Sequence, residues 1–308
     1  KIPCYALLGA VLATSSSATL ANTAPSTSKN EAAYSYQNLT EACDVFNKRL
    51  PSVPTKTCLN AQLKDSGARS VSGQIIWVRE FSPPTGVVPL GRILVLGGIH
   101  GDELSSSSLV FDWINNLNRQ HKGLFHWRIV PALNPDGLLA RKPSRMNARG
   151  VDLNRNFPTP DWEAETQKYW VNKTRRDPRR YPGPSALSEP ESKWFHDQVA
   201  SFKPDAVIAI HAPYGVLDFD GPHTPPKHIG QLYLNQIGTY PGSLGNWLGV
   251  QLSVPVLTVE LGTADKLPPE AERQYQWSDL IRWLTLTIHR QQKSTISKDA
   301  APSSTSSP

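Results

Sequence analysis

The stretch Gly97-Gly98-Ile99-His100-Gly101-Asp102-Glu103 places two potential zinc ligands three residues apart. It follows residues 92–96 (R-I-L-V-L), an apolar and β-branched run typical of a strand buried on both faces, and the paired glycines predict the strand's end. His100 and Glu103 are therefore expected at a strand's carboxyl end, where open α/β sheets bind ligands. Imidazole plus carboxylate is a common zinc ligand combination. Taken alone, the stretch also fits a glycine-rich turn with a polar helix start.

Two further apolar runs end in the same kinds of residue. His211 directly follows the run 205–210, and Glu260 directly follows the run 254–259. Charged groups are rarely buried unless they are paired or bind a metal, so packing alone does not account for three such strand ends. The pattern predicts one Zn²⁺ ion with a free carboxylate, Glu260, beside it. The expected metal ligands are His100, Glu103 and His211.

The composition fits an exported globular protein. The 308 residues are 39% hydrophobic and 19% charged, which suits one large domain or at most two. An apolar run at 2–13 follows Lys1 and precedes small residues near Ala18 and Ala21, the order found in secretory signal peptides. We therefore predict a signal peptide at 1–21 and a periplasmic or secreted location. The alternative is that this segment is a disordered tail. No apolar stretch is long enough to cross a bilayer, so stable membrane insertion is not expected.

The cysteines suit the same compartment. Removal of the signal leaves Cys43 and Cys58, an even pair at short separation. In an exported chain they predict one disulfide that closes a loop of about 15 residues and stabilises the fold by roughly 3 kcal/mol in the chain-entropy model. Two unpaired buried thiols are the alternative.

A second informative region begins with Asn134-Pro-Asp-Gly137, a strong turn sequence. It continues through several arginines into Gly150-Val-Asp-Leu-Asn-Arg-Asn-Phe157. Arginine runs are usually solvated. The planar guanidinium of Arg155 and the amide of Asn154 nevertheless suit bidentate recognition of a substrate carboxylate.

Together these motifs resemble the zinc carboxypeptidase family over about residues 91–284. Residues 145–155 (R-x-N-A-x-G-V-D-L-N-R) and 241–247 (P-G-S-L-G-N-W) look more like its bacterial murein peptide amidase branch than like the digestive enzymes. The resemblance implies an α/β fold: a three-layer α/β/α sandwich with a central mixed, mostly parallel sheet. We then expect an N-terminal cap at 22–69, a catalytic domain at 70–290 and a disordered tail at 291–308.

The resemblance also implies roles for individual residues. His100, Glu103 and His211 match the zinc ligands, and Asp152 matches the carboxylate that orients a ligand histidine. Glu260 matches the general base that later acts as the acid. Arg145 matches the arginine that polarises the scissile carbonyl, although Arg141 and Arg149 lie close enough to be alternatives.

On the substrate side, Asn154 and Arg155 match the pair that binds the terminal carboxylate. Tyr240 lies near the place of the family's mobile active-site tyrosine, and the alternative is a loop tyrosine that packs on Trp247. Asp218 and Asp220 either receive the ammonium of a diamino acid such as diaminopimelate or belong to a turn.

Three other stretches are expected to be structural. Ser105 to Ser108 are expected on a helix surface, with hydrogen-bond donation beside the metal site as the alternative. The arginine-rich segment 175–180 is expected in a solvated loop, with a cleft for an acidic peptide as the alternative. Ser188-Glu-Pro-Glu191 has the spacing of a capping box.

The expected activity is zinc-dependent hydrolysis of the γ-D-glutamyl-diaminopimelate bond of murein peptides. Removal of ordinary C-terminal amino acids is the alternative enzyme function, and a catalytically silent cell-wall-peptide binding protein is the alternative from another class. The formal net charge of +6 raises the question of nucleic acid, but no nucleic-acid motif accompanies it. An exported basic protein would more naturally meet anionic wall polymers.

Overall fold

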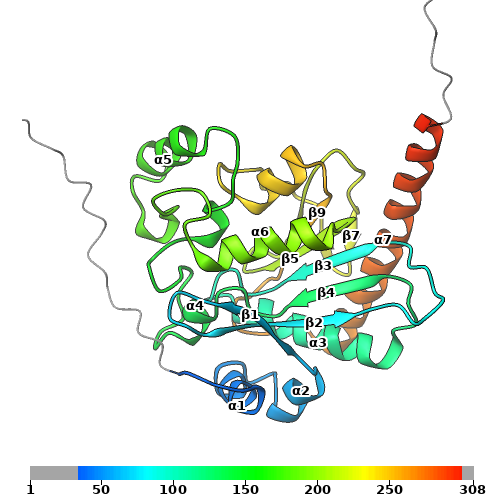
Figure 1. The fold of residues 1–308 in the computed structure, drawn as a ribbon, viewed down its shortest axis with the longest axis horizontal. Coiled ribbons are helices and arrows are strands. Elements are labelled where there is room, and N and C mark those ends of the chain that lie inside the picture. Colours follow the sequence, from blue (N-terminus) through cyan, green and yellow to red (C-terminus); the bar gives the residue numbers. More distant parts are fainter. Residues whose placement is uncertain (1–33, 300–308) are drawn as a thin grey trace, which may run out of the picture.

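A mixed seven-stranded sheet forms the centre of the molecule (Figure 1). The computed structural model describes residues 34–299, so the expected signal peptide lies outside the described residues. The strand order is β1-β2-β4-β3-β5-β9-β6, and a two-stranded sheet pairs β7 with β8. The strands are β1 (Lys64–Arg69), β2 (Ile75–Phe81), β3 (Arg92–Leu96), β4 (His126–Val130), β5 (Ala206–His211), β6 (Val216–Asp220), β7 (His228–Ile229), β8 (Leu232–Tyr233) and β9 (Val256–Glu260).

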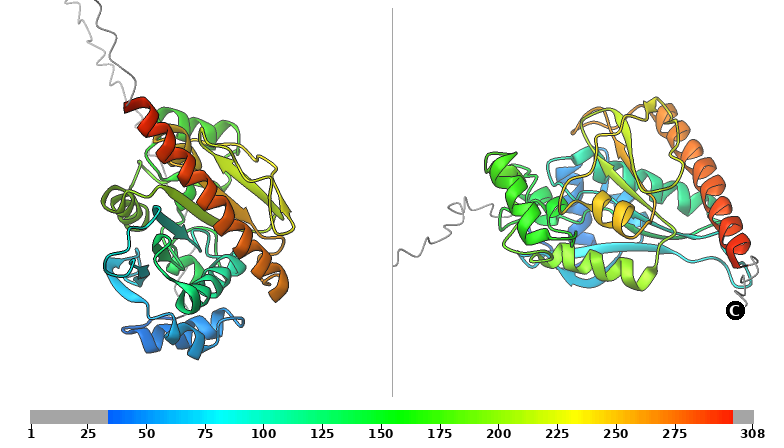
Figure 2. Two further views of the ribbon diagram at one scale, coloured as in Figure 1. Left: turned by 90° about the vertical axis from the view of Figure 1, so that its right-hand side faces the viewer. Right: turned by 90° about the horizontal axis from the view of Figure 1, so that it is seen from above.

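Helices cover both faces of this sheet (Figure 2). The helices are α1 (Leu39–Arg49), α2 (Thr55–Asn60), α3 (Leu104–Gln120), α4 (Pro135–Leu139), α5 (Trp162–Asn172), α6 (Pro190–Phe202) and α7 (Glu270–Asp299), with the short helices η1 (Leu153–Arg155), η2 (Pro178–Arg180) and η3 (Gly245–Gln251). The four central strands, β4, β3, β5 and β9, are parallel, and β1, β2 and β6 add antiparallel edges. The predicted mixed sheet between helical layers is confirmed.

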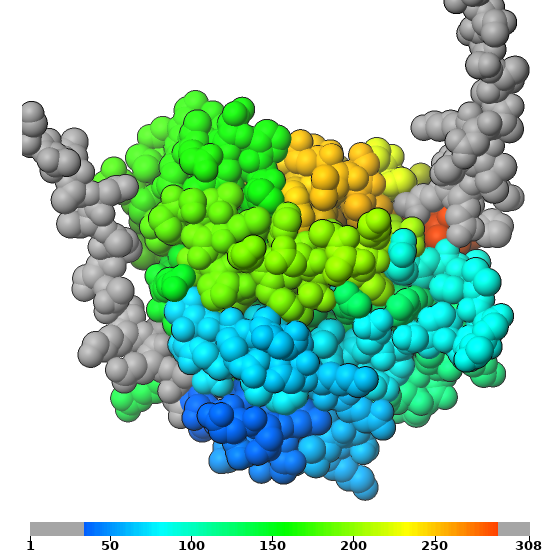
Figure 3. Space-filling model, in the orientation of Figure 1, coloured from blue at the N-terminus to red at the C-terminus, as the bar shows by residue number. Residues whose placement is uncertain are grey.

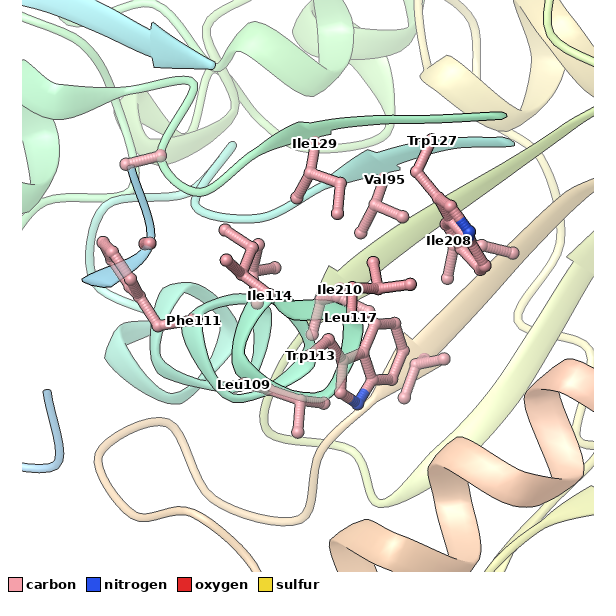
Figure 4. Close-up of a cluster of buried hydrophobic side chains, with 14 of the residues drawn as sticks. Val95, Leu109, Phe111, Trp113, Ile114, Leu117, Trp127, Ile129, Ile208 and Ile210 are labelled. Carbon is pink, nitrogen blue, oxygen red and sulfur yellow. The ribbon is translucent and has the colours of Figure 1, made fainter. Parts of the chain in front are cut away.

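Side-chain alternation along the central strands builds two cores. On β3, Ile93 and Val95 join the cluster that contains α3 and α7, whereas Leu94 and Leu96 join the cluster that contains α6. Figure 4 shows the first cluster, in which Trp113 of α3 packs beneath the strands. Parallel strands buried on both faces must be apolar throughout, which explains the uniform composition of residues 92–96.

The N-terminal segment is attached to the sheet rather than separated from it. Helices α1 and α2, blue in Figure 3, form one end of the molecule, and the structure joins Cys43 to Cys58 by a disulfide. Strand β1 pairs with β2 in the main sheet. The expected boundary between a cap and a catalytic domain at 69/70 therefore falls inside a single sheet.

The last helix is longer than expected. Helix α7 runs to Asp299, although the sequence analysis placed a disordered tail from residue 291. Residues 291–299 contain neither proline nor glycine, so nothing in their sequence breaks the helix. Within the described part of the chain, none of the helices is long and apolar enough to span a membrane.

Candidate active site

Three side chains converge where the parallel strands end. His100 lies in the turn after β3, Glu103 is the N-cap residue of α3, and His211 is the last residue of β5. Glu103 contacts both imidazoles: Oε1 lies 2.7 Å from Nδ1 of His100, and Oε2 lies 3.0 Å from Nδ1 of His211. All three are buried, and each offers a ligand atom within 4.8 Å of the others. Two imidazole nitrogens and one carboxylate are a donor set that suits zinc.

Asp152 occupies the other side of His100. Its Oδ1 lies 3.2 Å from Nε2 of His100, so Nδ1 of that ring faces the three-residue cluster while Nε2 faces a carboxylate. Oδ2 of Asp152 accepts a hydrogen bond of 2.9 Å from Arg145 Nε. Burial alone would raise the pKa of Asp152, but Arg145 and His100 outweigh it and hold the pKa well below its usual range. Asp152 is therefore an anion in contact with Nε2 of His100, on the side of the ring opposite to Glu103.

The same balance acts on Glu103. Burial would raise its pKa, but the two imidazoles outweigh burial and hold the pKa well below the usual value of a glutamate. The carboxylate that faces both histidines is thus ionised, as a metal ligand must be.

Glycine permits the close approach that shapes this turn. A Cβ on Gly101 would collide with the backbone of Gly137 in the Asn-Pro-Asp-Gly turn. That turn opens α4, where Asn134 Oδ1 accepts from Gly137 N at 2.8 Å and Asn134 Nδ2 donates to the carbonyl of Arg145 at 3.1 Å. The motif that sequence reasoning took only as a turn therefore also positions Arg145.

The serines of α3 also hold the turn. Ser105 to Ser108 are buried and not on the helix surface as expected. Ser106 Oγ accepts from Gly98 N at 2.8 Å, and Ser105 Oγ donates to Thr263 O at 2.6 Å. Helical periodicity did not reveal this burial, because it depends on how the turn before α3 folds back and on the distant loop at Thr263.

Glu260 lies next to this cluster. It ends β9 and pairs in register with His211 of β5. Its side chain is buried, and the Oε2 atom has no hydrogen-bond partner among the described residues. Burial and the neighbouring Glu103 raise the pKa of Glu260, while His211 opposes them.

A pocket of about 470 Å³ unites most of the predicted site residues. Those that line it are His100, Glu103, Arg145, Asn154, Arg155, His211, Asp218, Asp220, Tyr240 and Glu260. Asp152 lies behind the wall, fully buried. Of the three candidate arginines, Arg145 alone is among the lining residues; Arg141 is exposed, and Arg149 donates to the carbonyl of Ser188.

Arg155 and Tyr240 form a pair on one wall. The guanidinium carbon of Arg155 lies 4.7 Å from the centroid of the Tyr240 ring. Arg155 Nε is buried without a hydrogen-bond partner in the described chain. Burial lowers the pKa of Arg155, and the nearby Arg145 and Arg180 add to that effect while Asp152 opposes it. Asn154 Oδ1 is already engaged, because it accepts from Leu244 N at 2.8 Å.

The two aspartates at the far wall differ in their partners. Asp218 Oδ1 accepts hydrogen bonds from Phe219 N at 2.9 Å and Ile237 N at 3.1 Å. No hydrogen bond or ion pair is found for the side chain of Asp220 within residues 34–299. A Cβ on either Gly245 or Gly249 of η3 would overlap Asp220, so these glycines leave it space. Burial and the charge of Asp218 raise the pKa of Asp220 to about 7.

The arginine-rich segment contributes to the pocket rim. Asp177, Arg179 and Arg180 line the pocket, and Arg179 donates to Asp102 at 2.8 Å. These side chains are largely exposed, as expected of a solvated loop, but they also border the pocket, as the alternative had it. Only the folding of η2 over the turn 97–103 reveals the contact, and neither segment carries a local signal for it.

Ser188-Glu-Pro-Glu191 does not form the expected capping box. Helix α6 begins at Pro190, and its N-cap residue, Glu189, makes no side-chain cap hydrogen bond. Glu189 and Glu191 are instead buried and accept from Asn147 Nδ2. The same asparagine accepts from Val151 N, so these contacts support the segment between Arg145 and Asp152.

Comparison with known proteins places this chain in a family. The family model for zinc carboxypeptidases matches residues 60–228. The chain belongs to the zinc carboxypeptidase family, and it is a metallopeptidase or amidase of that family.

Among curated relatives, it is 28% identical to Murein peptide amidase A of Escherichia coli (strain K12) over 228 residues, which cover 70% of this chain and 88% of that protein. It is 32% identical to the Carboxypeptidase N catalytic chain of Homo sapiens over 278 residues, which cover 68% of this chain and 59% of that protein. The crystal structure of thrombin activatable fibrinolysis inhibitor shares the fold, with a TM-score of 0.58, 19% identity, and coverage of 82% of this chain and 75% of that one.

Proposed function

We propose that this protein hydrolyses the amide bond between the γ-carboxyl of D-glutamate and diaminopimelate in murein peptides. The unpartnered Oε2 of Glu260 in the pocket of His100, Glu103 and His211 carries this proposal. A buried carboxylate oxygen with a raised pKa and no partner is suited to accept a proton and return it. The relative named Murein peptide amidase A supports the substrate class.

The three-residue cluster would hold one Zn²⁺ ion. Zinc bound there polarises a carbonyl and lowers the pKa of bound water to about 7. Asp152 would orient His100, and the distance of 3.2 Å between its Oδ1 and Nε2 of His100 supports this role.

The remaining steps use side chains of this chain. Glu260 would take a proton from the attacking water and then deliver it to the nitrogen of the leaving diaminopimelate. Arg145 would donate to the scissile carbonyl oxygen, where negative charge develops, because it alone of the three candidate arginines lines the pocket. Arg155 would bind the carboxylate next to the cleaved bond through its free Nε, with Asn154 beside it and Tyr240 stacked on the guanidinium.

Asp220 supports a diamino acid as the leaving group. Diaminopimelate carries an ammonium at the end of its side chain, and Asp220 offers a carboxylate without a partner in the same pocket. Asp218 is a weaker candidate, because backbone amides already occupy its Oδ1 atom.

We further propose that the protein acts outside the cytoplasm, in the periplasm or as a secreted enzyme. The disulfide between Cys43 and Cys58 supports this location, because disulfides persist mainly in oxidising compartments.

Hydrolysis of L-alanyl-γ-D-glutamyl-diaminopimelate by zinc-loaded protein tests the function. We expect free diaminopimelate, detected by mass spectrometry, and no product from a chelated sample or the Glu260→Gln variant. A peptide that ends in an ordinary α-linked amino acid serves as the competing substrate. Cleavage of that peptide alone would replace the proposal with a conventional carboxypeptidase, and cleavage of neither would favour a binding protein.

A further inference from the structure

A second cavity lies at the opposite end of α3 from the candidate active site. This groove, of about 720 Å³, is lined by Leu59, Asn60, Gln62, Arg79, Phe81, Asn115, Leu117, Asn118, Arg119 and His121. It shares no lining residue with the first pocket. Helix α3 has 17 residues, so its ends lie roughly 25 Å apart. Glu103 caps one end, and Arg119 and His121 lie at the other.

The groove is cationic. Its lining contains two arginines and a histidine, several side-chain amides and no carboxylate. Leu59, in α2, precedes residue 60, where the match to the family model begins. The groove is therefore formed in part by the disulfide-linked segment that this chain carries ahead of the matched region.

Arg79 lines the groove and has no counter-ion among the described residues. Its guanidinium carbon lies 4.5 Å from the centroid of Phe81, and the Phe81 ring lies 5.5 Å from the His121 ring. Its one hydrogen bond, from Nη1 to the carbonyl of Gln62, is long at 3.5 Å, and its buried Nε has no partner in the described part of the chain. Burial lowers the pKa of Arg79, and no acidic group offsets that effect.

A neighbouring arginine in a similar stacked arrangement does have a carboxylate partner. Arg128, on the adjacent strand β4, lies 4.4 Å from the centroid of Phe202, nearly the same arrangement as Arg79 on Phe81. Arg128, however, donates to Glu80 at 3.1 Å and to Gln198 at 3.1 Å. Within one sheet, then, one stacked arginine has a carboxylate and the other does not. A half-buried cation without a counter-ion is costly unless something supplies one.

We propose that this groove is a binding site for a carboxylate-bearing ligand, held by the Arg79 guanidinium. The planar guanidinium forms paired hydrogen bonds with a carboxylate, and Arg119 adds a second cation at the rim. The exposed face of Leu59, together with Phe81 and Leu117, offers apolar contact for the body of the ligand. The amides of Asn60, Gln62 and Asn118 suit its hydroxyl or amide groups. An acidic amino sugar has this combination of groups.

N-acetylmuramic acid and N-acetylglucosamine are matched probes, because the first carries a lactyl carboxylate that the second lacks. Calorimetric titration of the zinc-loaded protein is expected to show saturable binding of N-acetylmuramic acid and at least tenfold weaker binding of N-acetylglucosamine. Arg79→Gln should weaken N-acetylmuramic acid binding by roughly tenfold, and the matched Arg128→Gln should leave it unchanged. Hydrolysis of the tripeptide by both variants should remain at the wild-type level, which separates this site from the active site.

Three outcomes would overturn the proposal: equal binding of the two sugars, N-acetylmuramic acid binding that survives in Arg79→Gln, or binding of inorganic phosphate but not of N-acetylmuramic acid. If Arg79→Gln fails to fold, Gln62→Glu tests the same point. Gln62 is exposed, and no hydrogen bond engages its side chain among the described residues, so this substitution places a negative charge in the groove and should repel the carboxylate. Binding is read without catalysis, so the result does not depend on which peptide bond the enzyme cleaves.

Discussion

The two sides of the candidate active site differ in how their polar groups are occupied. On the metal side, both oxygens of Glu103 contact imidazoles. Asp152 contacts His100 through one oxygen and accepts a hydrogen bond from Arg145 through the other. On the substrate side, Glu260 Oε2 and Arg155 Nε have no hydrogen-bond partner in the described residues. The carboxylate of Asp220, which lines the same pocket, makes no hydrogen bond or ion pair within residues 34–299.

This difference separates the groups that would hold the metal from the groups that would bind the substrate. Polar groups that contact one another hold each other in position and can present a metal in one geometry. Buried groups without partners carry a desolvation cost, which a substrate that supplies those partners relieves. If this division is correct, substitutions on the two sides should fail in different ways: loss of metal on one side, and loss of turnover or substrate affinity on the other.

The largest effect is expected from Glu260→Gln. A general acid–base group contributes roughly 10² to 10⁴ in rate, so kcat should fall by on the order of a thousandfold. The zinc content, measured by atomic absorption, should stay at the wild-type level, because Glu260 lies outside the three-residue cluster. A parallel loss of zinc would show that Glu260 is needed to hold the metal, and the two sides of the site would then not differ as proposed.

Asp152→Asn should fail in the opposite way. The amide keeps the size of the side chain but removes the anion that faces His100 and Arg145, so zinc affinity should fall by roughly 10- to 100-fold. Competition with a chelator measures this change. Excess zinc should restore much of the activity, whereas it should not rescue Glu260→Gln. An Asp152→Asn enzyme with wild-type zinc affinity would show that this carboxylate is not needed to orient the ligand.

Asp220→Asn should affect the choice of substrate. Loss of an ionic hydrogen bond to the substrate ammonium should raise KM for the diaminopimelate peptide by on the order of tenfold. A peptide with norleucine in place of diaminopimelate is the matched substrate and should be unaffected.

The same residue predicts a pH dependence. The pKa of Asp220 is raised to about 7, so its charge is present above that pH and is lost as the pH falls through it. The preference for the diaminopimelate peptide over the norleucine peptide, as a ratio of kcat/KM values, should therefore decline below about pH 7 in the wild type. It should be flat in Asp220→Asn, and a pH-dependent ratio in that variant would assign the effect to another group.

The sequence predicts the parts of this arrangement that are local. His211 and Glu260 stand directly after apolar strand patterns, and His100 and Glu103 lie in the turn that follows another. Parallel strands bring their carboxyl ends to one edge of the sheet. Other parts depend on contacts between distant segments. The sequence does not distinguish Asp218 from Asp220, because one of the two amides that bond to Asp218 comes from the distant Ile237.

The sequence did not predict the residues at the pocket rim or the hydrogen bond that supports Arg145, because both depend on contacts that have no local sequence signal. Arg179 lines the pocket and donates to Asp102, far away in the chain, and nothing in the charge run around Arg179 marks this contact. Likewise, Asn134 supports Arg145 across the loop that follows α4, a contact that the turn sequence itself does not encode.

The smallest effect is expected from Tyr240, which tests how the substrate side is held before substrate binds. Its hydroxyl has only a long contact of 3.5 Å to the carbonyl of Ile237, whereas its ring stacks on the guanidinium of Arg155. A cation–π contact of this kind contributes about 0.5 to 1 kcal/mol. Tyr240→Phe should therefore change kcat/KM by less than about twofold, and Tyr240→Leu should raise KM by roughly two- to fivefold with kcat retained. A large fall in kcat for Tyr240→Phe would instead mean that the hydroxyl moves onto the substrate during the reaction, and the wall of Arg155 and Tyr240 would then be a mobile element rather than a fixed one.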